Sequence, residues 1–178
     1  MIIIPGWLVA IATFPGVIVH EAAHMLFCRW RGVAVLDVCF FRVGNPAGYV
    51  VHEEAKDFNT SFLISVGPFF INSVLCLAIC FPALWPIHVF KLSDPLSYVL
   101  LWLGVSIGAH AFPSTGDANG LWAHARVAAR RMHPLAIASF PLVVLIYVAH
   151  ALAFFWFDVL YGIGVGIGLP MLVIDRLL

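Results

Sequence analysis

The sequence has little charge and no excess of either sign. Only 10% of its 178 residues are charged, and nine Lys and Arg residues balance nine Asp and Glu residues. Ordinary soluble domains carry about a quarter charged residues, so this composition excludes that class. Binding to nucleic acid depends on a basic surface, and a chain without a basic excess lacks that electrostatic basis. We therefore predict no nucleic-acid partner.

The sequence also lacks a disulfide pattern. None of its four cysteines forms a CxxC pair, and all of them lie in or beside apolar runs, at Cys28, Cys39, Cys76 and Cys80. This placement does not suggest the disulfide framework of a small extracellular domain. We interpret the cysteines as small apolar packing residues.

Apolar residues are abundant and make up 63% of the chain. A helix needs about 20 of them in succession to cross a hydrocarbon core of about 30 Å. Five runs approach that length, at roughly 3–28, 61–85, 96–113, 135–157 and 159–175. We predict an all-α polytopic membrane protein with about five transmembrane helices, built as a single membrane-embedded domain over residues 1–178. A kink is expected at Pro15 in the first run.

Two segments between these runs differ from them. Residues 33–54 are rich in β-branched and aromatic residues around a GNPAG turn cluster, which predicts a β-hairpin between the first and second spans. Residues 118–133 are typical of an interfacial helix after the third span, because one helical stripe is apolar: Leu121, Ala125, Ala128 and Met132. The domain is therefore expected to comprise a core (1–117), an interfacial helix (118–133) and two accessory segments (134–178).

The last run contains four glycines at alternate positions from Gly162 to Gly168, which form GxxxG spacings. Such spacings indicate close helix packing, and we expect it within the chain rather than between two copies.

Basic residues predict the orientation in the membrane. With alternating spans, Lys91 lies alone on one side, and all the other basic residues lie on the opposite side: Arg29, Arg31, Arg42, Lys56, Arg126, Arg130, Arg131 and Arg176. The positive-inside rule then places the N-terminus outside and the hairpin, the interfacial helix and the C-terminus in the cytoplasm. We predict a multi-pass protein of the cytoplasmic membrane.

One chemical motif stands near the end of the first span, His20-Glu21-Ala22-Ala23-His24. Positions i and i+4 share a helix face about 6 Å apart in rise, so His20 and His24 can hold one metal ion while Glu21 reaches a water molecule beside it. This is the HExxH arrangement of zinc hydrolases. The alternative, two core histidines and a capped glutamate, is weaker because ionisable side chains inside a membrane span are costly. We predict Zn²⁺ as the cofactor.

A catalytic zinc usually has three protein ligands, and Asp117 is the best candidate for the third. Pro113 and Gly116 are expected to end the third span on the cytoplasmic side, at the depth of His20 and His24. Asp117 could instead cap the following helix. His110 lies seven residues before Asp117. It could donate a hydrogen bond to the substrate or to a metal ligand. The alternative is an ordinary buried histidine.

Together these features resemble the site-2 protease family of intramembrane zinc metalloproteases. The resemblance covers roughly residues 14–120 and consists of the HEAAH motif, the hairpin, a GP…N element (Gly67, Pro68, Asn72) and the aspartate after the third span. The branch is divergent, because Phe112-Pro113-Ser114 and then Asp117-Ala118 stand where the family usually has Asn-x-x-Pro and an Asp-Gly pair. It is also small, and we expect no PDZ or CBS domain in a chain of this length.

The resemblance implies a role for each matching residue. His20, His24 and Asp117 would hold zinc, and Glu21 would activate water. Asn72 and His110 are candidates for substrate binding. The substrate would be a transmembrane or membrane-associated protein or peptide, added as a strand to the edge of the hairpin.

We therefore predict a membrane-embedded zinc endopeptidase with Glu21 as general base. One alternative is a non-proteolytic metal-binding protein that keeps the fold as a regulatory or scaffold module. Another is a bis-histidine haem or ion-transport protein.

Overall fold

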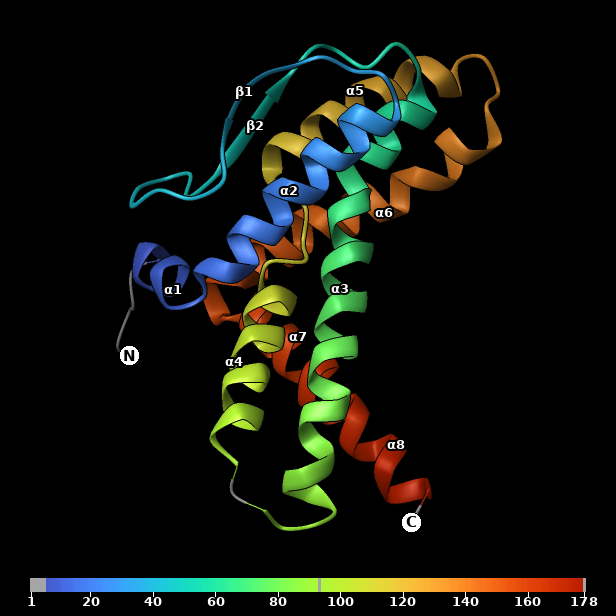
Figure 1. Ribbon diagram of the computed structural model, residues 1–178. Coiled ribbons are helices and arrows are strands. Elements are labelled where there is room, and N and C mark those ends of the chain that lie inside the picture. Colours follow the sequence, from blue (N-terminus) through green and yellow to red (C-terminus); the bar gives the residue numbers. More distant parts are fainter. Residues whose placement is uncertain (1–5, 93, 178) are drawn as a thin grey trace.

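The computed structural model describes residues 6–92 and 94–177, and 75% of it is helical. Figure 1 shows helices that cross at varied angles, with one small hairpin over one end of them. The elements are α1 (Gly6–Ala12), α2 (Phe14–Trp30), β1 (Val35–Cys39), β2 (Tyr49–His52), α3 (Phe58–His88), α4 (Pro95–Ala109), α5 (Thr115–Ala129), α6 (Pro134–Leu152), a 3₁₀ turn (Ala153–Phe155), α7 (Phe157–Ile163), a π-helical segment (Gly164–Gly168) and α8 (Leu169–Leu177).

Three helical segments of the described chain are long and apolar enough to cross a membrane: Phe58–His88, Pro134–Phe155 and Phe157–Leu177. A helical membrane protein is therefore supported, but the expected number of about five spans is not confirmed. The third predicted span, α4, has 15 residues and is only about 22 Å long, short of a hydrocarbon core of about 30 Å.

The first predicted span is broken into α1 and α2, which meet at an angle of 88°. The predicted kink at Pro15 is misplaced, because the break falls at Thr13. Pro15 instead lies in the first turn of α2, where its missing N–H is not needed for a helical hydrogen bond. Counting the bent pair as one span brings the total to four.

The predicted hairpin is confirmed. Strands β1 and β2 are antiparallel, with Val38 opposite Val50 and Cys39 opposite Tyr49. The turn cluster 44–48 lies in the connection between them, as expected. The hairpin contacts α2 and lies across it at the end of the molecule where α5 is found (Figure 1).

Helix α3 is the central element and contacts α2, α4, α5 and α8. It begins at Asp57, whose carboxylate accepts a hydrogen bond of 2.9 Å from the backbone N–H of Thr60. The Thr60 hydroxyl also accepts from Arg31 at the end of α2, at 3.0 Å. These bonds join the start of α3 to the end of α2. They therefore hold the C-terminal end of α2, the helix that carries the HEAAH motif, in place.

Helix α5 corresponds to the predicted interfacial helix. Leu121 and Ala125 are fully buried and pack with Val66 of α3 and Val143 of α6. The predicted stripe is wrong at Met132, which lies beyond the end of α5 with a left-handed backbone (φ 59°) and a side chain that is 77% exposed. The helix ends too early for Met132 to continue its apolar face.

The glycines of the last segment pack within the chain, as predicted, but only two of the four do so. A Cβ on Gly166 would lie 2.9 Å from Sγ of Cys80, and one on Gly162 would lie 2.7 Å from the backbone nitrogen of Ala109. Gly164 and Gly168 have nothing within 4 Å. Cys80 is a buried free thiol that fills space left by glycine, which confirms its role as a packing residue.

Candidate metal centre

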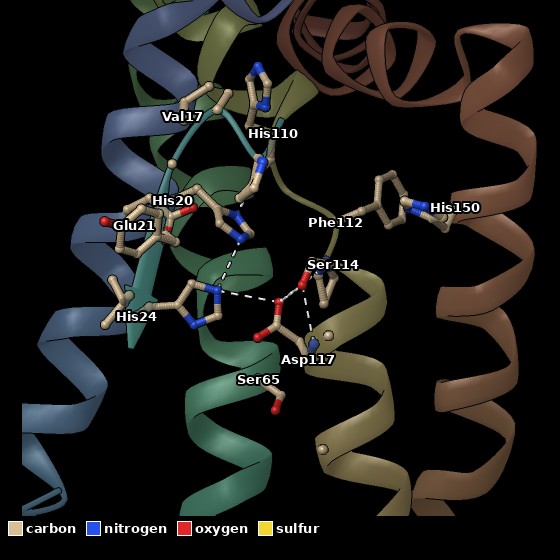
Figure 2. A pocket seen from close by; sticks show the side chains of 18 of the residues that line it. Val17, His20, Glu21, His24, Ser65, His110, Phe112, Ser114, Asp117 and His150 are labelled. Carbon is tan, nitrogen blue, oxygen red and sulfur yellow. Dashed lines mark hydrogen bonds and ion pairs between the residues drawn. The ribbon is translucent and has the colours of Figure 1, made fainter. Parts of the chain in front are cut away.

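Helix α2 carries the HEAAH motif, and its three ionisable residues are buried: His20 is 8%, Glu21 9% and His24 6% exposed. Because His20 and His24 are one helical turn apart, their rings face the same way (Figure 2). The Nε2 atoms of the two rings are 3.1 Å apart. The helix therefore presents two imidazole nitrogens at one point.

Asp117 reaches the same point from the first turn of α5. Its Oδ2 atom lies 3.5 Å from Nε2 of His24. One ligand atom from each of His20, His24 and Asp117 fits within a mutual distance of 4.8 Å, a spacing at which the three could hold one metal ion. The structure thus brings together the three residues that the sequence predicted as ligands.

Asp117 also has a structural role, although it is not the helix cap itself. Ser114 is the N-cap of α5, and its backbone N–H and hydroxyl donate to Oδ2 of Asp117 at 2.8 and 2.6 Å. The hydroxyl accepts from the backbone N–H of Asp117 at 3.2 Å, which completes a capping box. The ligand role and the capping role therefore involve the same carboxylate and are compatible.

The charge of Asp117 suits a cation. Burial raises the pKa of this carboxyl, but the neighbouring His24 and the hydrogen bonds from His24 and Ser114 outweigh burial and lower the pKa to about 2. The carboxylate is consequently ionised at neutral pH.

The backbone at the end of α4 orients His20. Its Nδ1 atom lies 2.7 Å from the carbonyl oxygen of His110. A carbonyl can only accept, so Nδ1 carries the hydrogen and Nε2 presents its lone pair to His24 and Asp117. Ligating histidines in metal sites are typically held this way, with the second ring nitrogen bonded to a carbonyl or carboxylate.

The ring of His110 is directed away from the three-residue cluster (Figure 2). Its Nε2 atom lies 2.7 Å from Oγ1 of Thr13, at the break between α1 and α2. The Thr13 hydroxyl donates to the carbonyl of Val9 at 2.6 Å and therefore accepts from His110. The ring is thus a bonded, partly buried group, and His110 contacts the ligand cluster through its main-chain carbonyl.

Asn72 lies behind the cluster. It is fully buried, and its Nδ2 atom donates to the carbonyls of Ile107 and His110 at 3.1 and 3.0 Å. It does not line the cavity that contains the cluster. The predicted direct contact between Asn72 and a substrate is therefore not available in this conformation, because the side chain is fully buried and lies outside the cavity.

The cluster opens into a cavity of about 1100 Å³ between α2, the hairpin, α5 and the junction of α6 and α7. Figure 2 shows His150 of α6 on the side opposite α2, beyond Phe112. The connection between the two strands packs on Glu21 at Gly48, where a Cβ would lie 2.7 Å from Cγ of Glu21. Within residues 6–92 and 94–177, no side chain or backbone group forms a hydrogen bond or ion pair with the Glu21 carboxylate.

Two residues of the site, Ser114 and Gly48, were not predicted from the sequence. Ser114 could have been found, because its spacing to Asp117 is that of a capping box at a helix start. Gly48 carries no such signal, since its contact with Glu21 depends on how the hairpin folds over α2.

Comparison with known protein families, with curated proteins and with solved structures gives no match to this chain. The fold and the site by themselves define its class: a helical membrane protein with a candidate metal centre of two histidines and one aspartate.

Proposed function

We propose that the protein is a membrane-embedded zinc endopeptidase. The observation that carries the proposal is the convergence of His20, His24 and Asp117 on one point, with Glu21 beside them in the same cavity. Three of these residues, His20, Glu21 and His24, are ionisable groups in the apolar helix α2, where such groups are costly unless they serve a function.

The donor set fits zinc. Two imidazole nitrogens and one carboxylate oxygen are ligands that zinc accepts, and three protein ligands leave one position open, as in catalytic zinc sites. The tautomer of His20 and the ionised state of Asp117 already match what a cation requires. When bound, zinc supplies Lewis acidity that polarises a carbonyl and acidifies water.

Glu21 is the proton carrier in this proposal. Its carboxylate has no partner among the described residues, so it can accept a proton from a water molecule in the cavity. The same carboxyl group can then donate that proton to the amine released from a cleaved peptide bond. Glu21 is not needed as a ligand, because His20, His24 and Asp117 supply three.

The substrate in this proposal is a peptide segment that leaves its helix inside the membrane. A helical peptide bond has its carbonyl bonded within the helix, so the segment must become extended before cleavage. Each strand of the two-stranded sheet has an outer edge that can pair with an extended peptide. The hairpin lines the cavity next to Glu21, so pairing there would bring the peptide to the cluster.

The orientation is proposed from charge. The connection between α3 and α4, which holds Lys91, lies at the opposite end of α3 from the hairpin (Figure 1). Helix α8 ends at this same end (Figure 1), since Oδ1 of Asp175 lies 2.6 Å from Nε2 of His88 at the end of α3. The prediction that Arg176 lies on the side of the hairpin is therefore wrong, and Arg176 joins Lys91. The other basic residues still outnumber these two, so with the positive-inside rule the hairpin and the cluster face the cytoplasm and Lys91 faces outward.

One observation favours the alternative of a metal-binding regulatory or scaffold protein without proteolysis. The backbone of Gly48 packs directly on Glu21, which restricts access to the carboxylate from the hairpin side. A haem held by two histidines is not favoured, since His20 and His24 lie on one helix face with their Nε2 atoms 3.1 Å apart, whereas axial haem ligands approach from opposite faces.

The test uses the purified protein in detergent with a panel of transmembrane peptides. Metal content is measured first, and cleavage is then followed by mass spectrometry with the protein as isolated, after chelation and after zinc is returned. The proposal expects about one zinc per chain, cleavage that chelation abolishes and recovery with zinc. Bound zinc with no cleavage of any peptide, including peptides inserted in vesicles, would favour the regulatory alternative.

A further inference from the structure

Two side chains share one backbone oxygen behind the metal centre. The carbonyl of His110 accepts from Nδ1 of His20 at 2.7 Å and from Nδ2 of Asn72 at 3.0 Å. This carbonyl follows the last turn of α4, where carbonyl groups have no intrahelical partner and are free to bond elsewhere. The arrangement links α3, α4 and α2 through a single acceptor.

A polar side chain at position 72 is unfavourable if its role is packing alone. It is fully buried, and its Oδ1 atom is the one buried side-chain oxygen or nitrogen of the described chain that has no hydrogen-bond partner. An unpartnered buried acceptor costs free energy, whereas an apolar residue of the same shape would not have this cost. Only the two N–H groups of the amide, which are both bonded, can offset this cost.

Those groups hold the end of α4. One amide nitrogen bridges the carbonyls of Ile107 and His110, so it fixes the direction in which the His110 carbonyl points. That direction decides which nitrogen of His20 carries hydrogen, because Nδ1 can keep its hydrogen only while the carbonyl accepts it.

We propose that Asn72 is a positioning residue of the metal centre. By fixing the His110 carbonyl, it selects the Nδ1–H tautomer of His20 and keeps the Nε2 lone pair directed at the metal position. The inference rests on the proposed metal site but not on proteolysis, and it gives Asn72 a role without any contact to substrate.

Asn72→Leu is the principal test variant, because it keeps the volume and removes both donors together with the unpartnered acceptor. We expect its thermal stability to be equal to or above that of the parent. Its zinc affinity, measured by competition with a chromophoric chelator, should fall about 10–100-fold, the usual effect of removing a group that supports a metal ligand. Equal zinc affinity in the folded variant would overturn the proposal.

Ser106→Ala is the matched control. Ser106 is a buried residue of α4, 1% exposed, whose hydroxyl donates to the carbonyl of Trp102 at 2.6 Å. Removing this hydrogen bond also removes a buried polar group next to the site, but it leaves the His110 carbonyl in place. Zinc affinity should stay within about twofold of the parent, and a loss as large as that of Asn72→Leu would show a general effect of disturbing α4 and contradict the proposal.

A second measurement needs no metal. In the metal-free protein labelled with ¹⁵N-histidine, the ring signals of His20 should show hydrogen on Nδ1, and in Asn72→Leu or Asn72→Ala they should show a mixture of both tautomers. An unchanged Nδ1–H tautomer in both variants would overturn the positioning role. Absence of zinc binding by the parent would instead refute the metal site, so the two failures are distinguishable.

Discussion

Oδ2 of Asp117 and Nε2 of His24 lie 3.5 Å apart, although the two residues come from different helices and from opposite ends of the core sequence. The same Oδ2 atom accepts two hydrogen bonds from Ser114 at the start of α5. The beginning of one helix and the face of another are thereby fixed to each other at the proposed metal position.

The first prediction separates these two uses of Asp117. Asn at this position can still accept the capping hydrogen bonds, but a neutral amide is a much weaker zinc ligand than a carboxylate. In the metal-free protein, Asp117→Asn should therefore change the free energy of unfolding by no more than about 1 kcal/mol relative to the parent. The variant should not bind zinc. The measurement is metal content by mass spectrometry beside a melting curve.

Ser114→Ala is the matched variant for that experiment. It removes the N-cap at a cost of about 1 kcal/mol and leaves the carboxylate of Asp117 in place. We expect lower stability with zinc retained. If Asp117→Asn keeps full zinc while Ser114→Ala loses it, Asp117 acts through the helix start and is not a ligand.

The second prediction concerns Gly48. A Cβ there would lie 2.7 Å from Cγ of Glu21 and 3.1 Å from the backbone oxygen of Phe40, so Gly48→Ala must displace Glu21 or the hairpin. A displacement of about 1 Å can reduce turnover about 100-fold. Gly48→Ala should bind zinc normally and cleave peptide at about that reduced rate.

Gly44→Ala provides the control in the same loop, because its nearest neighbour would be Nε of Arg42 at 3.9 Å. It should retain the parental turnover. Equal losses in the two variants would mean that loop flexibility, and not the contact with Glu21, limits the reaction.

The third prediction compares two glycines of the π-helical segment. A Cβ on Gly166 would meet Sγ of both Cys80 and Cys76 at 2.9 and 3.0 Å, whereas one on Gly164 would meet nothing within 4 Å. Gly166→Ala should lower the free energy of unfolding by about 1–3 kcal/mol through overpacking. Gly164→Ala should raise it by up to about 1 kcal/mol, since alanine favours helix. Unfolding in mixed micelles measures both, and equal effects would contradict the packing described for this segment.

The fourth prediction concerns orientation. In a background with Cys39 replaced by Ser, single cysteines at Lys91 and Arg130 are labelled with a reagent that does not cross the membrane, in intact cells and in inverted vesicles. Position 91 should react from outside and position 130 from the cytoplasm. The reverse pattern would place the metal centre on the outer side.

Local and non-local features differ in how well the sequence predicts them. The shared face of His20 and His24 follows from helical spacing alone, and the hairpin follows from residue composition around one turn cluster. The meeting of Asp117 with them was expected only from matched depth in the membrane, and the structure provides the contact.

The break at Thr13 could not be predicted, because its partners are distant in the sequence. The Thr13 hydroxyl accepts from His110, and the indole of Trp102 donates to the carbonyl of Ala12 at 3.0 Å. The length of α4 was likewise overestimated, since Ala111 and Phe112 are apolar but lie beyond the helix end. Apolar composition marks burial or membrane contact, and it does not mark where a helix stops.

The most direct test of the proposed function is the comparison of zinc content and peptide cleavage in the parent and in Glu21→Gln. Gln has nearly the same shape as Glu but cannot accept a proton at neutral pH. The account predicts about one zinc per chain in both proteins and loss of cleavage in Glu21→Gln by at least about 100-fold, within the range of general acid–base contributions. Parental cleavage by zinc-loaded Glu21→Gln would contradict it.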